Sequence, residues 1–194
     1  MQHIERAGVH SGYSIAVYPP YNLSDIMLDK IIECSTQLAL SLKTKGLINI
    51  QFLVYHNELY VIEVNPRASR TIPYISKVTG VPMVELATKI MVGAKLKKLG
   101  FGTGLYKTSP YVAVKVPVFS FEKLNDVNSQ LGPEMKSTGE VLGMGKTIEE
   151  AHFKGLVSAG FKLCHPSKQR EVGVYFQVND QDKFEILGLA KKFS

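Results

Sequence analysis

The sequence predicts one α+β body, followed by a short segment that is too small to bury a core of its own. Two apolar, β-rich runs at 47–55 and 59–65 stand next to each other and predict an antiparallel strand pair. Amphipathic helical patterns flank this pair, and a further β-branched run follows at 111–119. Adjacent strands mixed with separate helices are typical of the α+β class.

Length and composition describe a globular chain. Its 194 residues are 45% hydrophobic, which is enough for one domain or slightly more. No apolar run approaches the length of a membrane span, and no basic-then-apolar leader begins the sequence. We therefore expect a cytoplasmic protein without a membrane partner.

The formal net charge of +6 fits a nucleic-acid partner, a site for anionic phosphates, or simple solubility. The lysines are dispersed and are not interleaved with aromatic residues, so we expect no nucleic-acid partner. Cys34 and Cys164 have no metal-type spacing, and Cys34 lies in a helical pattern where a buried free thiol is expected.

The N-terminal part begins with residues 8–18, which read as a glycine-interrupted strand ending at Pro19. Ser24 is then a suitable N-cap for an amphipathic helix that Gly46 ends. The two strands of the predicted pair follow, joined by a short turn at 56–58.

The middle of the chain alternates between helices and strands. Two short helices are expected at 72–79 and 83–92, before the strand at 111–119. Residues 120–146 are rich in glycine and read as loop. Thr147 and Glu150 have capping-box spacing, so a helix is expected from there to about residue 160.

The C-terminal part contains a polar, linker-like stretch at 163–170, one strand at 172–178 and one helix at 180–192. A single strand and helix cannot bury a core. This segment is therefore either docked on the main body or the beginning of a further domain.

The residues with the clearest chemistry are Gln51 on one strand and Glu63 and Asn65 on the next. They offer only hard oxygen donors, which magnesium and manganese prefer. Glu63 and Asn65 project from one face of a strand. Gln51 joins them only if the register pairs it with Glu63, through an odd-numbered loop or a bulge. The alternative is an edge hairpin with solvated polar residues, against which the surrounding apolar residues indicate a largely buried sheet; these are Ile48, Ile50, Phe52, Val61, Ile62 and Val64.

Two further stretches suit a phosphate ligand. Arg67 and Arg70 follow the oxygen cluster directly, and their guanidinium groups match phosphate oxygens. The stretch from Gly8 to Gly12 has glycines that let the backbone approach a ligand, with polar tips from His10 and Ser11. A cation beside arginines is the arrangement that a nucleotide triphosphate requires.

Taken together, several segments resemble the large chain of carbamoyl-phosphate synthase. The most specific are Glu63-Val-Asn-Pro-Arg-Ala-Ser-Arg-Thr-Ile-Pro and Leu131-Gly-Pro-Glu-Met-Lys-Ser-Thr-Gly-Glu-Val, with further matches at 3–12, 46–52 and 76–82. The resemblance covers roughly residues 1–160. It implies that residues 1–160 form the C-terminal lobe of the second, carbamate-phosphorylating ATP-grasp half, an antiparallel sheet with flanking helices. Residues 161–194 would be a linker and the start of the α/β, methylglyoxal-synthase-like regulatory domain.

The resemblance also implies roles for single residues. Gly8, Val9, His10 and Ser11 match ATP-contacting positions, and Gln51, Glu63 and Asn65 match metal ligands, the first two also lying against the nucleotide. Arg67 and Arg70 match residues near the transferred phosphate. The implied reaction is ATP-dependent formation of carbamoyl phosphate from carbamate, with Mg²⁺ or Mn²⁺ and with K⁺ as a further ion. The implied partners are the small glutaminase subunit and the rest of the large chain, in pyrimidine or arginine biosynthesis.

Two departures from the family pattern stand out. Tyr13 replaces the acid that usually follows His-Ser-Gly. The resemblance begins inside a domain, so Met1 is expected to be an internal methionine of a truncated chain, inactive on its own. The alternatives are another ATP-grasp carboxylase or ligase, against which the stretch from Leu131 to Val141 argues, and a non-catalytic assembly module.

Overall fold

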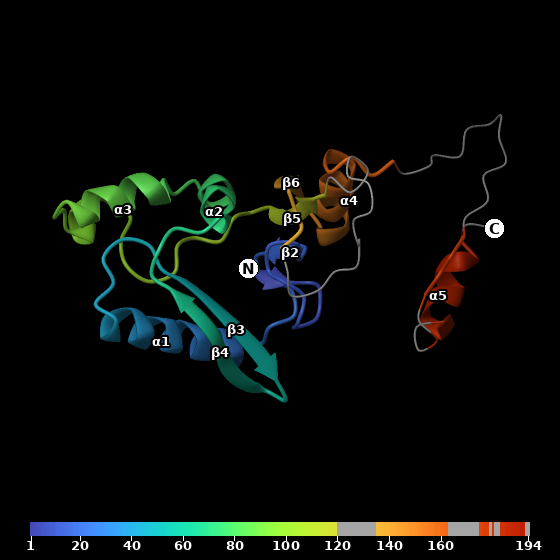
Figure 1. The fold of residues 1–194 in the computed structure, drawn as a ribbon, viewed down its shortest axis with the longest axis horizontal. Coiled ribbons are helices and arrows are strands. Elements are labelled where there is room, and N and C mark those ends of the chain that lie inside the picture. The colour runs from blue at the N-terminus through green and yellow to red at the C-terminus, as the bar shows by residue number, and fades with distance from the viewer. Residues whose placement is uncertain (120–134, 163–174, 179, 181–182, 193–194) are drawn as a thin grey trace. The chain divides into compact units, whose positions relative to one another are not determined.

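The computed structural model describes residues 1–119, 135–162, 175–178, 180 and 183–192. Contacts divide the chain into two compact units, Met1–Phe161 and Lys162–Ser194. In the first unit, the described residues form a four-stranded sheet, a two-stranded sheet and several helices (Figure 1). The predicted α+β fold is thereby confirmed.

The four-stranded sheet is antiparallel and joins the two ends of the first unit. Its strands are β1 (Gln2–His3), β2 (Ala16–Tyr18), β5 (Val112–Val118) and β6 (Gly139–Gly145), in the order β1-β2-β5-β6. Ala16 of β2 pairs with Lys115 of β5, although residues 19–111 lie between these strands in the sequence. The pairing therefore depends on contacts between distant parts of the chain.

One face of this sheet is covered by α4 (Ile148–Ser158). The core between them consists of Val17, Val114, Val116 and Ala151, all at most 1% exposed. Gly143 of β6 lies directly under the helix, and a Cβ placed there would come within 2.0 Å of the Ala151 carbonyl oxygen. Sheet and helix therefore touch through their backbones at this point.

The start of α4 follows the predicted capping pattern. Thr147 Oγ1 accepts a hydrogen bond from the Glu150 backbone N–H at 3.2 Å. The Glu150 carboxylate accepts one from the Lys146 N–H at 2.8 Å, so it serves the residue before the N-cap rather than the N-cap itself. Both contacts satisfy backbone donors at the helix start.

The other face of the sheet is covered by α2 (Thr71–Thr79), whose Tyr74 and Val78 pack on Ala113. The Tyr74 hydroxyl donates a hydrogen bond to the Ala113 carbonyl oxygen at 2.8 Å. Burial raises the pKa of Tyr74, so the hydroxyl keeps the proton that it donates. After α2 come α3 (Met83–Met91) and a short 3₁₀ helix, η1 (Leu96–Lys98).

The second sheet is a hairpin of β3 (Asn49–Tyr55) and β4 (Glu58–Asn65), which α1 (Asp25–Ser41) accompanies (Figure 1). Ser24 is the N-cap of α1, as predicted. The turn between the strands consists of His56 and Asn57, both with positive φ, and is one residue shorter than predicted. Two successive residues of this conformation form the turn that suits the twist of a hairpin.

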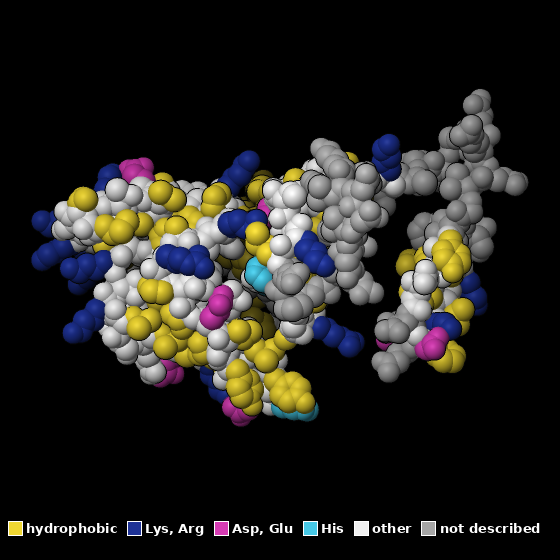
Figure 2. Space-filling model, viewed as in Figure 1, with side chains coloured by type: hydrophobic (Ala, Val, Ile, Leu, Met, Phe, Trp, Pro, Cys, Tyr) yellow, Lys and Arg dark blue, Asp and Glu magenta, His cyan; other side chains and the backbone are white. Residues whose placement is uncertain are grey.

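The prediction that the hairpin is largely buried was wrong. Val61 and Ile62 are 42% and 57% exposed, while Ile48, Ile50, Phe52 and Val64 are only half-buried. Tyr55 and Tyr60 are exposed as well, and Figure 2 shows apolar side chains gathered over this region. The apolar residues of the hairpin are therefore largely surface residues. Among the described helices, α1 is the one that packs most on β4.

Three other predictions were corrected. Only Ala16–Tyr18 of the expected strand at 8–18 is extended; the preceding residues turn back on themselves, and the Tyr13 N–H donates to the His10 carbonyl oxygen. β6 lies in a region predicted as loop, because its three glycines are typical of turns. Cys34 is half-buried rather than buried.

The second unit contains α5 (Lys183–Ala190), which lies within the helix predicted at 180–192. Of the strand predicted at 172–178, residues 172–174 lie outside the described residues, and 175–178 form no strand. Across the described residues of both units, no helix combines the length and the apolar character of a membrane span.

Candidate functional site

A β-bulge places the three predicted metal ligands together. Gln51 pairs with Glu63, whereas its neighbour Phe52 pairs with Val61, so Ile62 is an extra residue on β4. Without this bulge, the two-residue turn would pair Gln51 with Ile62 and send the Glu63 side chain to the opposite face. The bulge therefore aligns Gln51 with Glu63.

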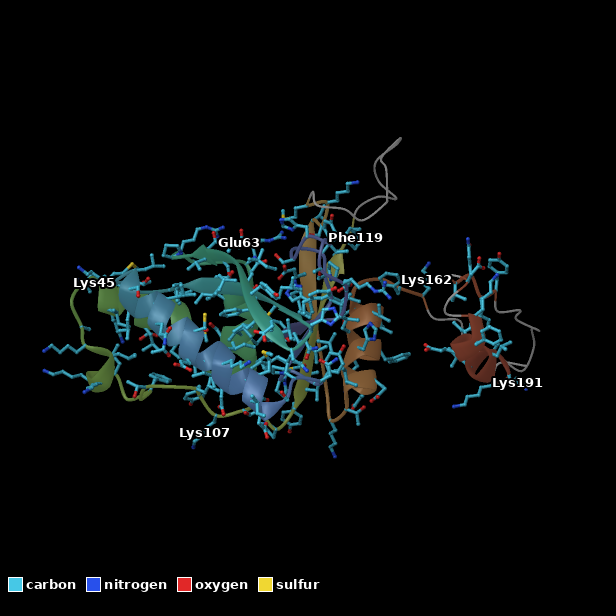
Figure 3. All side chains as sticks on the ribbon, turned by 90° about the horizontal axis from the view of Figure 1, so that it is seen from below. Lys45, Glu63, Lys107, Phe119, Lys162 and Lys191 are labelled. Carbon is cyan, nitrogen blue, oxygen red and sulfur yellow. The ribbon has the colours of Figure 1, made fainter. Side chains whose placement is uncertain are left out.

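The side chains of Gln51 and Asn65 converge on the Glu63 carboxylate. Gln51 Nε2 and Asn65 Nδ2 both donate to Glu63 Oε1, at 2.6 Å and 2.8 Å. Glu63 lies on the side of the hairpin away from α1 (Figure 3). Glu63 is exposed, while Gln51 and Asn65 are half-buried, so solvent and solutes reach the carboxylate of the cluster.

The donor set of this cluster fits a hard divalent cation that a phosphate ligand also holds. It provides one carboxylate and two amide oxygens, and Mg²⁺ commonly uses one or two carboxylates together with phosphate oxygens. Among the described residues, no group of three or more His, Cys, Asp or Glu side chains could hold a metal. A single carboxylate with two amides is weak for a metal alone and suited to a metal–nucleotide complex.

The stretch from Gly8 to Gly12, here called the glycine loop, is predicted to contact a ligand and lies next to this cluster. Gln51 Nε2 also donates to Ser11 Oγ, at 3.5 Å. Gly8 has φ of +106°, a conformation that residues with a side chain rarely adopt. His10 Nδ1 accepts a hydrogen bond from the Gly12 N–H at 2.9 Å, which fixes the ring across the loop. Val9 N–H donates to the Arg6 carbonyl oxygen at 3.4 Å, within the same turn.

The two predicted arginines follow β4. Arg67 Nη2 donates to Asn65 Oδ1 at 3.4 Å, which ties this guanidinium to the oxygen cluster. Arg70 precedes α2, and its side chain contacts residues outside the oxygen cluster. Its Nη2 donates to Ser137 Oγ at 3.4 Å and lies 3.9 Å from Glu140 Oε1. Arg67 therefore belongs to the cluster itself, and Arg70 to a second group of polar residues.

That second group contains two residues that the sequence analysis missed. Lys115 is 2% exposed, and its Nζ lies 3.4 Å from Glu140 Oε1 and 3.2 Å from the Ser11 carbonyl oxygen. The signal was present, because Lys115 is the only charge in the apolar run from Val112 to Val118. Glu140 lies on β6, whose glycines predict a loop from the sequence, so the sequence does not place its side chain.

Arg70, Lys115 and Glu140 line a cavity of about 520 Å³ together with Lys77 and Tyr74. Within this lining, the Lys115 and Arg70 cations both lie close to the Glu140 carboxylate. A second cavity, of about 350 Å³, is lined by Glu150 and Lys154, which already pair with each other at 2.7 Å.

His3, on the edge strand next to β2, should make stability depend on pH. Burial, and next the charge of Lys115, lower the pKa of His3 to about 4. In the unfolded chain the pKa of this histidine is about 6.5. Between pH 6.5 and pH 4 the unfolded state therefore binds a proton that the folded state does not bind. We expect the His3 contribution to the free energy of unfolding to fall by about 2 kcal/mol between pH 7 and pH 5.

Urea denaturation of the wild-type chain and of His3→Gln at both pH values tests this expectation. The variant should lose less stability on acidification than the wild type, by that same amount. Equal losses in the two proteins would contradict it.

Comparison with known proteins adds a family assignment. Residues 2–99 match the family described as "Carbamoyl-phosphate synthase L chain, ATP binding domain". The chain is 55% identical over 192 residues to the carbamoyl phosphate synthase large chain of Clostridium botulinum (strain Kyoto / Type A2), and 56% identical over 191 residues to that of Clostridium beijerinckii. These alignments cover 99% and 98% of this chain but only 18% of each relative.

Solved structures show the fold more widely. The biotin carboxylase domain of a single-chain bacterial carboxylase has a TM-score of 0.55 at 20% identity, over 75% of this chain and 38% of that one. The urea amidolyase of K. lactis has a TM-score of 0.57 at 19% identity, over 72% of this chain and 10% of that one. At such identities the likeness concerns the fold alone, and it agrees with an ATP-grasp lobe.

Proposed function

This chain belongs to the family of carbamoyl-phosphate synthase large chains, and on that premise we propose that its first unit holds one side of a metal–ATP site for phosphorylation of carbamate. The observation that carries the proposal is the convergence of Gln51 and Asn65 on Glu63, next to Ser11 of the glycine loop. An oxygen cluster of low charge beside a backbone loop is what a metal-bound triphosphate needs.

Each part of the site has a separate task. Gln51, Glu63 and Asn65 would hold Mg²⁺ or Mn²⁺, which when bound offsets the charge of the phosphate oxygens. Gly8, Val9, His10 and Ser11 would contact the nucleotide through the loop backbone. Arg67 and Arg70 supply guanidinium donors for the charge that develops on the transferred phosphoryl group and its acceptor.

The chain spans 18% of the length of the relatives that it matches. The complete reaction and its partners are therefore proposals as well. The acceptor would be carbamate and the product carbamoyl phosphate. The partners would be a small glutaminase subunit and the remaining parts of a large chain. For residues 161–194 we propose a linker and the beginning of a regulatory domain.

Titration calorimetry with a non-hydrolysable ATP analogue tests the site, with and without Mg²⁺. We expect metal-dependent binding to the wild-type chain and a loss of at least tenfold in affinity for Glu63→Gln, equivalent to about 1.4 kcal/mol. The variant loses the one negative ligand of the cluster, while its amide keeps nearly the same shape.

Glu58→Gln is the matched control, because Glu58 is an exposed glutamate at the other end of β4. It should bind like the wild type. Binding that is independent of both Mg²⁺ and Glu63, or no binding by a folded chain, would overturn the proposed site.

A further inference from the structure

Lys115 connects the oxygen cluster of Gln51, Glu63 and Asn65 with Arg70. Its ammonium group donates to the Ser11 carbonyl oxygen at 3.2 Å and to Glu140 Oε1 at 3.4 Å. The Ser11 hydroxyl accepts from Gln51, which in turn donates to Glu63. Glu140 lies 3.9 Å from Arg70. The two halves of the site thus meet at the backbone of Ser11 and the side chain of Lys115.

The glycine loop is fixed from the sheet side at two successive carbonyl groups. Lys115 binds that of Ser11, and Ser137 Oγ donates to that of Gly12 at 2.9 Å. The loop has no strand partner at these positions, because β2 begins only at Ala16. Its conformation therefore depends on these two side chains, on the contact of Gln51 with Ser11 Oγ and on its internal turns.

A lysine is a costly way to fill this position. Burial lowers the pKa of Lys115, and the charge of Glu140 opposes this effect. Replacing a buried ion pair by apolar residues is often neutral or stabilising, so packing alone does not require a charge here. What an apolar residue cannot do is donate a hydrogen bond to Ser11.

We infer that Lys115 is a positioning residue, which holds the Ser11 carbonyl and thereby the Gly8–Ser11 loop in the conformation that receives the nucleotide. The inference rests on the proposed nucleotide site. Lys115 contacts neither the metal ligands nor the nucleotide in this role, and it acts through the loop backbone. Because Glu140 links Lys115 to Arg70, the same contact aligns the glycine loop with Arg70.

The test is nucleotide affinity in Lys115→Met and Lys115→Arg, measured with the ATP analogue and Mg²⁺. Lys115→Met is expected to bind about tenfold more weakly, and Lys115→Arg to recover most of that loss, since it retains charge and donor. Lys77→Met is the matched control. Lys77 lines the same cavity, but no hydrogen bond joins it to the described residues of the glycine loop. Its variant should therefore bind normally.

A spectroscopic readout separates positioning from general damage. The Ser11 carbonyl ¹³C resonance of the free chain should shift in Lys115→Met and remain near its wild-type position in Lys77→Met, because only the first loses the donor to that oxygen. If Lys115→Met does not fold, Lys115→Gln replaces it. Its side chain is one bond shorter and uncharged, and it should weaken binding to the same degree.

The outcomes distinguish the two proposals. Metal-dependent binding that Glu63→Gln abolishes and that folded Lys115 variants leave unchanged would overturn the role of Lys115 and leave the proposed function intact. Equal weakening by Lys77→Met would also overturn it, because cavity charge would then explain the effect. A folded wild-type chain that binds no nucleotide would overturn both.

Discussion

Gly143→Ala is expected to destabilise the first unit by about 3 kcal/mol or more, the upper range for overpacking. A Cβ at this position would lie 2.0 Å from the Ala151 carbonyl oxygen and 2.4 Å from the Gly155 backbone nitrogen. Both atoms belong to the backbone of α4, so no rotation of a side chain can relieve the contact. The helix must move off the sheet and open the core around Val114 and Val116.

Gly139→Ala is the control on the same strand. Among the described residues, an added Cβ there meets only Val118 Cβ, at 4.0 Å, which is an ordinary contact. Its stability should remain within about 0.5 kcal/mol of the wild type, as for surface substitutions in general. Urea denaturation followed by circular dichroism compares the two variants, and coincident midpoints would show that α4 does not rest on Gly143.

Glu140→Leu is expected to cost about 3–5 kcal/mol, the range measured when one partner of a buried ion pair is removed. Lys115 would keep the Ser11 carbonyl as an acceptor but lose its nearest carboxylate, with Arg70 still close enough to lower its pKa further. The side chain would then have to release its proton, or the strand would have to expose it.

Two measurements identify this mechanism. The double variant Glu140→Leu with Lys115→Met should recover most of the lost stability, because it removes the unpaired charge. The deficit of Glu140→Leu should also shrink as pH rises from 7 towards 10, since a lysine with a lowered folded pKa gains stability up to its unfolded pKa of about 10.4. A deficit that is constant with pH would point to lost packing instead.

The sequence predicts the helices and the hairpin well, because these depend on local signals. Ser24 and Thr147 begin their helices by capping, and the two apolar, β-rich runs between Asn49 and Asn65 define two strands. β6 shows the limit of such signals. Gly143 and Gly145 are required by the close approach of α4, a tertiary contact, and in sequence they look like turn residues.

The candidate site could be predicted only in part, because the sequence shows residue types but not tertiary contacts. The types of residue at Gln51, Glu63 and Asn65 indicate an oxygen cluster, but their alignment requires the bulge at Ile62, which no local pattern announces. The burial of the hairpin was misjudged because hydrophobicity does not reveal whether a surface is covered. Lys115 was overlooked because its acceptor, the Ser11 carbonyl, lies on a distant loop.

The pairing of β2 with β5 has a consequence for the order of folding. The hairpin forms within residues 49–65, and β5, β6 and α4 lie within residues 112–158, so each can assemble from nearby chain. Joining Ala16 to Lys115 closes a much longer loop, whose entropic cost is recovered only when the sheet docks. We therefore expect the bond from Lys115 to Ser11 to form among the last contacts, so that the hairpin exists before the loop that completes its site.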